Sequence, residues 1–309
     1  MSRRGSDSRV SQTSGTAQNL TSVWGFAANN IYAVGAAGSI LHWNGTNWSA
    51  QTSGTAANFL GVQGPDSGHV YAWADDNTLH VSHDGSTWSS LGSPFTFAAH
   101  SLFATTATDM WITFNGSRVR YSSNDGVSFG ADVGNIGLSS TLCLFGLSPT
   151  DMFMGFNGGA TEIMRWTSGA HDGSAWVDIA NTLPSGLNFN SIWGTADGDM
   201  FAAGSSSGGA IYHSTDLFTT WTGLGYHNGA LPIPTMSSIN SVFGGNGLVY
   251  ATGPTSNNHF VVMSYDRAKD LWSSDYDQSI SNNARQLWVD SSTGYAVAVG
   301  DGGTIIKKG

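Results

Sequence analysis

The chain has unusually few charged residues, and acidic residues outnumber basic ones. Asp, Glu, Lys and Arg make up 10% of its 309 residues, against about 25% in an average soluble protein. Eleven basic and 21 acidic side chains leave a net charge of −10 at pH 7. Because binding to a phosphate backbone requires clustered cations, this composition argues against a nucleic-acid partner.

A single cysteine and short apolar runs narrow the class of protein further. Cys143 has no second cysteine with which to form an internal disulfide or a cysteine-based zinc site, so we expect a small core residue there. No segment approaches the roughly 20 apolar residues of a membrane span. The start MSRRGSDSRV is not followed by the apolar segment of a signal peptide. We therefore predict no membrane span and see no signal peptide.

Catalytic and metal-binding patterns are scarce too. Glu162 is the sole glutamate, and most aspartates lie in Gly-, Ser- and Asn-rich segments, where they hydrogen-bond to their own backbone. The nine histidines form no H-x-H pair and no H-x-x-x-H pair. The segments GVSFG (126–130) and GSSSG (204–208) match G-x-S-x-G, but neither precedes the helical pattern that a nucleophile elbow requires. We predict no catalytic residues, no metal site and no cofactor. The enzymatic alternative is glycoside hydrolysis by two aspartates, with Asp301 as one candidate.

What the chain does contain is a sevenfold repeat. A short strand-like segment recurs every 39 to 50 residues, which is the period of a four-stranded propeller blade. The segments are SVWG at 22–25, GVQG at 61–64, SLFA at 101–104, CLFG at 143–146, SIWG at 191–194, SVFG at 241–244 and QLWV at 286–289. We predict an all-β, seven-bladed β-propeller, a single domain over 1–309, with blades starting near residues 19, 58, 98, 139, 187, 236 and 282.

A second strand in each repeat carries an aromatic residue at its third position. Since neighbouring blades pack face to face, we expect these aromatics to fill the space between blades. They are Tyr32, Tyr71, Trp111, Phe153, Phe201 and Tyr250, with Tyr295 near this place in the seventh repeat, offset by two if the closing glycines are aligned. We assign one shared position on the third strand to His42, His80, Arg120, Arg165, His213, Met263 and Lys307.

The repeats leave one blade without a fourth strand. Six fourth strands are headed by Trp48, Trp88, Phe129, Trp176, Trp221 and Trp272. The sequence of residues 10–25 is similar to that of residues 49–64, which connect the end of blade 1 to the start of blade 2. We therefore expect residues 8–13 to complete the last blade, which closes the ring and removes an open sheet edge.

Three hairpins carry a family resemblance. The segments SHDGSTW (82–88), SSNDGVSF (122–129) and STDLFTTW (214–221) resemble the Asp boxes of sialidases, sortilin-type receptors and photosystem-assembly propellers. The resemblance implies a propeller fold and a structural turn role for Asp84, Asn124 and Asp216, away from any catalytic face. Sialidase activity would also require three arginines around a substrate carboxylate, and no such set is evident. The sequence motifs VWG, YAVG and ILHW are similar to motifs in the repeats of large bacterial surface proteins.

The loops that share one face of such a ring differ in length between blades. Blades 4 to 6 carry long ones at 182–190, 205–210, 225–235 and 254–260. Loops on a rigid scaffold commonly carry function. The candidate ligand-binding residues on them are Tyr226, His227, Asn228, Asn257, Asn258, His259 and Asn188.

Uncharged aromatic, amide and imidazole groups suit neutral hydroxyls or a peptide surface. We therefore predict a non-enzymatic binding propeller for carbohydrate or a protein partner, extracellular or at the cell surface. It is expected to be a monomer or part of a longer chain. Besides the hydrolase alternative, a passive structural or adhesin module stays open.

Overall fold

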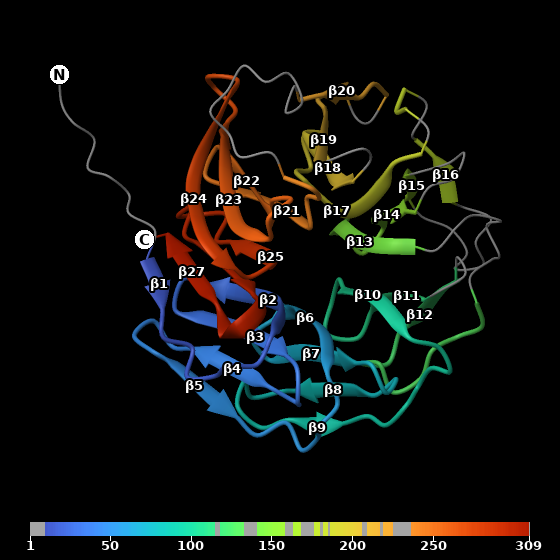
Figure 1. Ribbon diagram of the computed structural model, residues 1–309. Coiled ribbons are helices and arrows are strands. Elements are labelled where there is room, and N and C mark those ends of the chain that lie inside the picture. Colours follow the sequence, from blue (N-terminus) through green and yellow to red (C-terminus); the bar gives the residue numbers. More distant parts are fainter. Residues whose placement is uncertain are drawn as a thin grey trace.

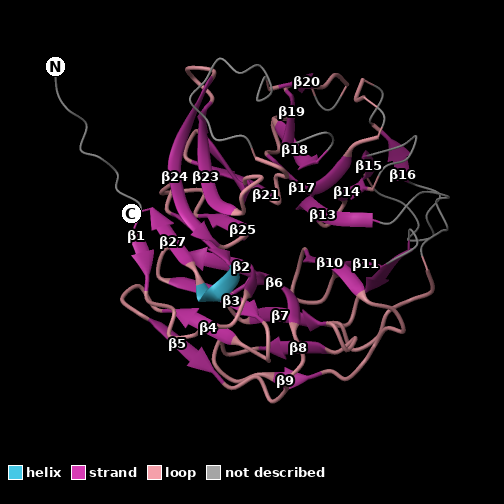
Figure 2. Ribbon diagram, in the orientation of Figure 1, coloured by secondary structure: helices cyan, strands magenta, loops and turns pink. Residues whose placement is uncertain are grey.

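The computed structural model shows seven antiparallel sheets around a central axis (Figure 1). It describes residues 10–114, 118–132, 141–157, 163–167, 176–179, 182–184, 186–205, 209–216, 219–224 and 236–308, and the side chains of all these except 141–142 and 275–281. Strands and loops make up nearly all of this part of the chain (Figure 2), and η1 (Asp301–Gly303) is a single helical turn. The predicted all-β propeller is confirmed. No helix within the described residues is long and apolar enough to cross a membrane.

In each blade the strands follow the chain from the axis outward. Blade 1 has β2 (Leu20–Ala27), β3 (Asn30–Gly35), β4 (Ile40–Trp43) and β5 (Trp48–Gln51); blade 2 has β6 (Phe59–Asp66), β7 (His69–Ala74), β8 (Leu79–Ser82) and β9 (Ser89–Ser90). Blade 3 has β10 (Ala99–Ala104), β11 (Met110–Phe114) and β12 (Arg118–Ser122); blade 4 has β13 (Thr141–Ser148), β14 (Asp151–Phe156), β15 (Ile163–Trp166) and β16 (Trp176–Asp178).

The remaining blades follow the same order. Blade 5 has β17 (Asn188–Gly194), β18 (Met200–Ser205), β19 (Gly209–Ser214) and β20 (Thr222–Gly223); blade 6 has β21 (Ser241–Gly245), β22 (Leu248–Pro254), β23 (His259–Asp266) and β24 (Leu271–Ser281). Blade 7 has β25 (Ala284–Val289), β26 (Ala296–Gly300) and β27 (Ile305–Lys308), with β1 (Val10–Gln12) as its outer strand.

The N-terminal strand closes the ring as predicted. β1 pairs antiparallel with β27, and Val10 lies opposite Lys307. The two similar sequence segments also have the same local structure. Ser14 Oγ donates to Thr16 O and Ser53 Oγ donates to Thr55 O, both at 3.1 Å. The loop before blade 1 is therefore a structural copy of the loop before blade 2.

The second strands lie between two layers of neighbouring side chains. Their aromatics are at most 1% exposed, because sheets on both sides cover them. In blade 7 Val297 lies opposite Trp288, as Tyr32 lies opposite Trp24 in blade 1. Aligning the closing glycines is therefore the correct register, and Tyr295 lies outside the shared position.

The third-strand position assigned from the sequence is right in four blades and one residue off in three. His42, Arg165, His213 and Lys307 lie opposite the shared second-strand position. In the other three blades that place belongs to Val81, Tyr121 and Ser264, the neighbours of His80, Arg120 and Met263. A shift of one residue turns a side chain to the opposite face of the sheet, so His80 is buried at 3% exposure beside Phe59.

In blade 3 only part of the expected pattern lies within the described residues. Its described residues form a three-stranded sheet, β10-β11-β12. Phe129, expected to head a fourth strand, packs against Phe95 with ring centroids 6.0 Å apart, and residues 133–140 lie outside the described part of the chain. Gly130, the next residue, donates its backbone N–H to Tyr121 O at 3.0 Å.

Candidate functional site

The inner strands of all seven blades surround a depression on the axis of the ring, with a volume of about 200 Å³. We number their positions from Leu20 in blade 1, so that Thr21 is position 2, Ser22 position 3 and Trp24 position 5. Each position then has one equivalent residue in every blade. Comparing these equivalents shows which side chains the blades have in common and which blades differ.

A belt of hydrogen bonds at position 3 links each inner strand to that of the next blade. In blade 1, Ser22 Oγ accepts from Val62 N at 3.0 Å. The equivalent acceptors are Ser101 for Leu144 N (3.1 Å), Ser191 for Val242 N (3.1 Å), Ser241 for Leu287 N (3.3 Å) and Gln286 for Val23 N (2.9 Å). These bonds hold the walls of the depression in register.

Blades 2 and 4 complete the belt by other means. Position 3 of blade 2 is Gly61, and Gln63 Oε1 accepts from Ala104 N at 2.7 Å instead. In blade 4 the thiol of Cys143 donates to Phe189 O at 3.4 Å. Burial raises the pKa of this thiol to about 12, so it keeps the proton that it donates. Each of the seven junctions therefore carries a side-chain bond.

Aromatic side chains at position 5 meet across the axis. The ring of Trp24 lies 6.3 Å from that of Phe103 and 6.0 Å from that of Phe243, centroid to centroid. Trp24 Nε1 also donates to Gly64 O at 2.9 Å. These contacts join blades 1, 3 and 6. A second depression of about 200 Å³ is also lined by Trp24 and Phe103. It lies beside the loops that connect the first and second strands of blades 2 to 4, which we call the 1–2 loops.

Position 2 forms the mouth of the first depression. Thr21 Oγ1 donates to Phe59 O at 2.7 Å, Asn190 Nδ2 to Ile239 O at 3.0 Å and Asn240 Nδ2 to Ala284 O at 2.7 Å. In these blades the mouth residue ties one blade to the next. The mouth residues of blades 2, 3 and 7 are Leu60, His100 and Arg285, and they break this pattern of residue types.

Leu60 and Arg285 differ in chemical type from Thr21, Asn190 and Asn240, the mouth residues that bond to the neighbouring blade. Leu60 has no polar atom, yet it is 37% exposed. Arg285 forms a two-point ion pair with Asp301, with Nε–Oδ1 at 2.9 Å and Nη2–Oδ2 at 3.0 Å. Asn283 Nδ2 donates to the same carboxylate at 2.9 Å. Asp301, the candidate for the hydrolase alternative, is therefore engaged with Arg285.

The described arginines do not gather around one point. Each lies in an ion pair with an aspartate, and the pairs belong to different blades or blade junctions. They are Arg118 and Arg120 with Asp132, Arg165 with Asp151, Arg267 with Asp199, and Arg285 with Asp301. Among the described residues no carboxylate lines the central depression, and no group of three or more His, Cys, Asp or Glu side chains is arranged to hold a metal.

The ligand-binding residues proposed from the long loops are only partly described. Tyr226, His227 and Asn228 lie outside the described residues. Asn257 and Asn258 form the turn between β22 and β23, where Asn258 has a positive φ of 59° and its N–H donates to Thr255 O at 2.9 Å. His259 follows as the first residue of β23.

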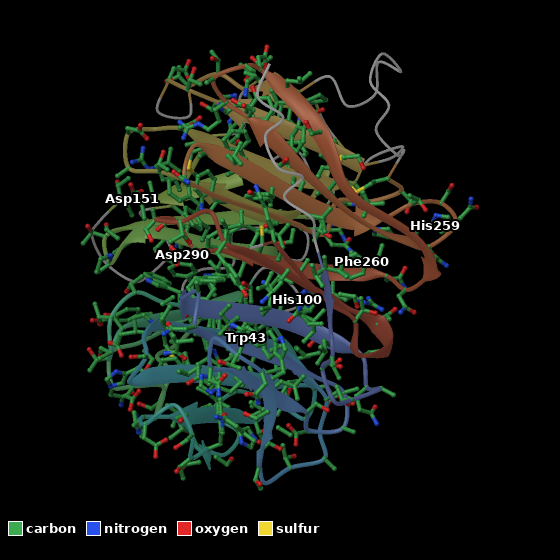
Figure 3. All side chains as sticks on the ribbon, turned by 90° about the vertical axis from the view of Figure 1, so that its left-hand side faces the viewer. Trp43, His100, Asp151, His259, Phe260 and Asp290 are labelled. Carbon is green, nitrogen blue, oxygen red and sulfur yellow. The ribbon has the colours of Figure 1, made fainter. Side chains whose placement is uncertain are left out.

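Asn188 begins β17 and forms a bridge with Asn157 of blade 4. Figure 3 shows His259 at one face of the disc and Asp151 and Asp290 toward the other, with His100 between them. The structure thus places His259 at the edge of a face, whereas the mouth residues lie around the axis. A ligand role for the four described loop residues stays a prediction.

The three hairpin residues bind their own turns. Asp84 Oδ1 accepts from Ser86 N and Thr87 N at 2.8 and 2.6 Å. Asn124 Oδ1 accepts from Ser128 N at 3.0 Å, and Asp216 Oδ1 accepts from Thr220 N at 2.8 Å. The amides of Thr87 and Ser86 hold the pKa of Asp84 well below its usual range.

Leu60, His100 and Arg285 were absent from the sequence-based candidates. The signal for them lies in the aligned repeats, one residue before SVWG and its equivalents. Loop length, on which the sequence-based candidates rest, does not point to this position.

Comparison with solved structures agrees with the fold. YCF48 from Cyanidioschyzon merolae superposes with a TM-score of 0.70 at 14% identity, over 97% of this chain and 98% of that one. "YCF48 bound to D1 peptide" gives 0.67 at 14% identity over 97% and 95%, and U3-55K gives 0.69 at 12% over 97% and 98%. At these identities the likeness shows the propeller fold alone. No protein-family model and no curated protein matches the chain.

Proposed function

We propose that this chain is a non-enzymatic recognition propeller that binds a segment of a partner protein at the mouth of the central depression. The observation that carries the proposal is the break in the repeat at position 2. Three blades use this position to tie the ring together, whereas Leu60 and Arg285 present apolar and cationic groups to the mouth.

This set of groups fits a peptide better than a sugar or a reacting bond. An exposed Leu beside an Arg provides an apolar contact and an ionic contact within one mouth, and protein interfaces combine an apolar centre with polar contacts at its rim. A solved propeller described as YCF48 bound to D1 peptide, similar in fold at 14% identity, is a precedent for peptide recognition by this architecture. A lining without a described carboxylate counts against the aspartate-pair hydrolase.

The finer features of this function are also proposals. The turn at 257–259 would extend the contact surface outward from the mouth. Carbohydrate binding is the second ligand class predicted from the uncharged polar surface, and a glycan array distinguishes it from peptide binding. We also propose an extracellular or cell-surface location from the composition.

The proposal is tested by selecting peptides from a random display library on the purified protein and measuring their affinity. Leu60→Asp and Arg285→Ala are each expected to weaken binding at least about tenfold, or about 1.4 kcal/mol. Val127→Asp is the matched control, because Val127 is also exposed but lies on the 3–4 hairpin of blade 3. Selected peptides that bind Leu60→Asp and Arg285→Ala as tightly as the parent chain would place recognition elsewhere.

A further inference from the structure

Two histidines lie close together at one edge of blade 2. They are on the face of the ring that carries the turns between first and second strands and between third and fourth strands. His69 begins β7 and His83 follows β8, and their ring centroids lie 5.3 Å apart. Val70 and Ser82, the residues next to them, are paired across the two strands. The antiparallel pairing thus brings together two side chains that are 14 positions apart in the sequence.

Each histidine is bonded to a carboxylate through one ring nitrogen. His69 Nδ1 lies 3.0 Å from Asp66 Oδ1, and His83 Nε2 lies 2.8 Å from Asp125 Oδ2. A carboxylate accepts hydrogen bonds, so it favours the tautomer whose N–H points at it. The lone pair is then left on Nε2 of His69 and on Nδ1 of His83.

The two carboxylates are themselves held in place. Asp66 Oδ1 also accepts from Gly68 N at 2.8 Å, and Asp125 Oδ1 accepts from the Tyr71 hydroxyl. Metal-binding histidines characteristically donate their second ring N–H to such a fixed carboxylate, which orients the ring and increases its basicity. This arrangement is built here twice, once within blade 2 by Asp66 and once across the junction of blades 2 and 3 by Asp125.

We propose that His69 and His83 form a site for one divalent transition-metal ion of the zinc type, with water completing its coordination. Metal–nitrogen bonds of about 2.0–2.1 Å at a tetrahedral angle place two imidazole centroids about 5.2 Å apart, close to the 5.3 Å observed. Imidazole suits zinc, copper and nickel. The side chains of His69 and His83 are 30% and 54% exposed, which leaves both within reach of solvent.

The charge around the pair favours a cation. Asp66 and Asp125 contact the two rings, and Asp84 follows His83 directly in the chain. The site lies on the face opposite the mouth of the central depression and shares no residue with it. It is therefore independent of the proposed peptide recognition.

The test is titration of the full, untagged and chelator-treated protein with ZnCl₂ by calorimetry. We expect one equivalent to bind, and His69→Gln and His83→Gln to weaken binding at least tenfold each. Glutamine keeps a hydrogen-bond donor for the carboxylate. His259→Gln, on the other face, should bind as the parent does. Absence of saturable binding, or binding unchanged in either glutamine variant, overturns the proposal.

Two further measurements separate a metal site from a structural role of the pair. In ¹⁵N spectra, zinc should shift Nε2 of His69 and Nδ1 of His83, and a shift of the opposite nitrogens would contradict the tautomers inferred here. Asp125→Asn should lower zinc affinity on the order of tenfold through the orientation of His83. Unfolding of each variant without metal shows whether it is folded.

Discussion

The indole of Trp73 occupies the space beside Gly61 that a side chain would otherwise fill. A Cβ at Gly61 would lie 1.9 Å from Cζ2 of Trp73. The loss of a position-3 side chain in blade 2 is therefore matched by a bulky residue on the next strand, and Gln63 restores the bond to blade 3. The belt around the axis tolerates a change of residue when a neighbour compensates.

Gly61→Ala is expected to destabilise the ring. The added methyl group forces the buried Trp73 ring to move, and overpacking of this kind costs about 1–3 kcal/mol. Urea unfolding measures the change. Gly130→Ala is the control, because the nearest atom to its Cβ is at an ordinary 3.7 Å. Equal stability of Gly61→Ala and the parent would show that Trp73 has room to move.

Gln63→Leu is expected to lower the free energy of unfolding by about 1–3 kcal/mol. It leaves the buried N–H of Ala104 without its 2.7 Å acceptor, and an unsatisfied buried donor carries a penalty of this size. Gln18→Ala, at an exposed position, should change stability little. A Gln63→Leu protein as stable as Gln18→Ala would mean that the belt contributes nothing at this junction.

Deletion of residues 1–14 is expected to destabilise the whole ring. It removes β1, which pairs with β27 through Val10, Ser11 and Gln12, and it exposes the edge of blade 7. Calorimetry should show a lower melting temperature, and light scattering should show more self-association. Gln12→Ala should leave both unchanged, because within the described part of the chain this side chain bonds to Val10 O and Ser11 O of its own strand.

Tyr32 is expected to make stability fall at alkaline pH. Burial, with a smaller effect of the Asp84 charge, raises its pKa from 10.0 to about 12. A folded pKa above the unfolded one means that the contribution is complete below pH 10.0 and is lost as pH rises toward 12.

Tyr32→Phe removes this contribution together with the hydroxyl bond to Gly85 O at 2.9 Å, about 1 kcal/mol at neutral pH. The stability advantage of the parent over Tyr32→Phe should therefore shrink between pH 10 and about 12, as measured by denaturant unfolding. A difference that stays constant over that range would show that Tyr32 ionises equally in both states.

Much of the fold could be predicted because each blade is a local unit. The alternation of apolar and polar residues and the repeat period predict that Tyr32 and Trp111 lie in the core. The similarity of residues 10–25 to residues 49–64 predicts that residues 10–12 belong to blade 7. The register of the strands does not follow from the repeat alone: the position predicted for His80 and Arg120 is one residue away from the one that the structure shows. Hydrogen bonding between strands, rather than distance from a turn, decides which residues face each other.

The sequence by itself determined the number of blades, the strand order and the closure of the ring, because these depend on repeats and contacts between neighbouring segments. Only the tertiary structure decided that Trp24 meets Phe103 and Phe243 across the axis, that Leu60 and Arg285 share one mouth, and that His69 lies beside His83. The physical reason is that these groups come from different strands or blades. Their proximity follows from the closed ring and the strand register, which no local pattern encodes.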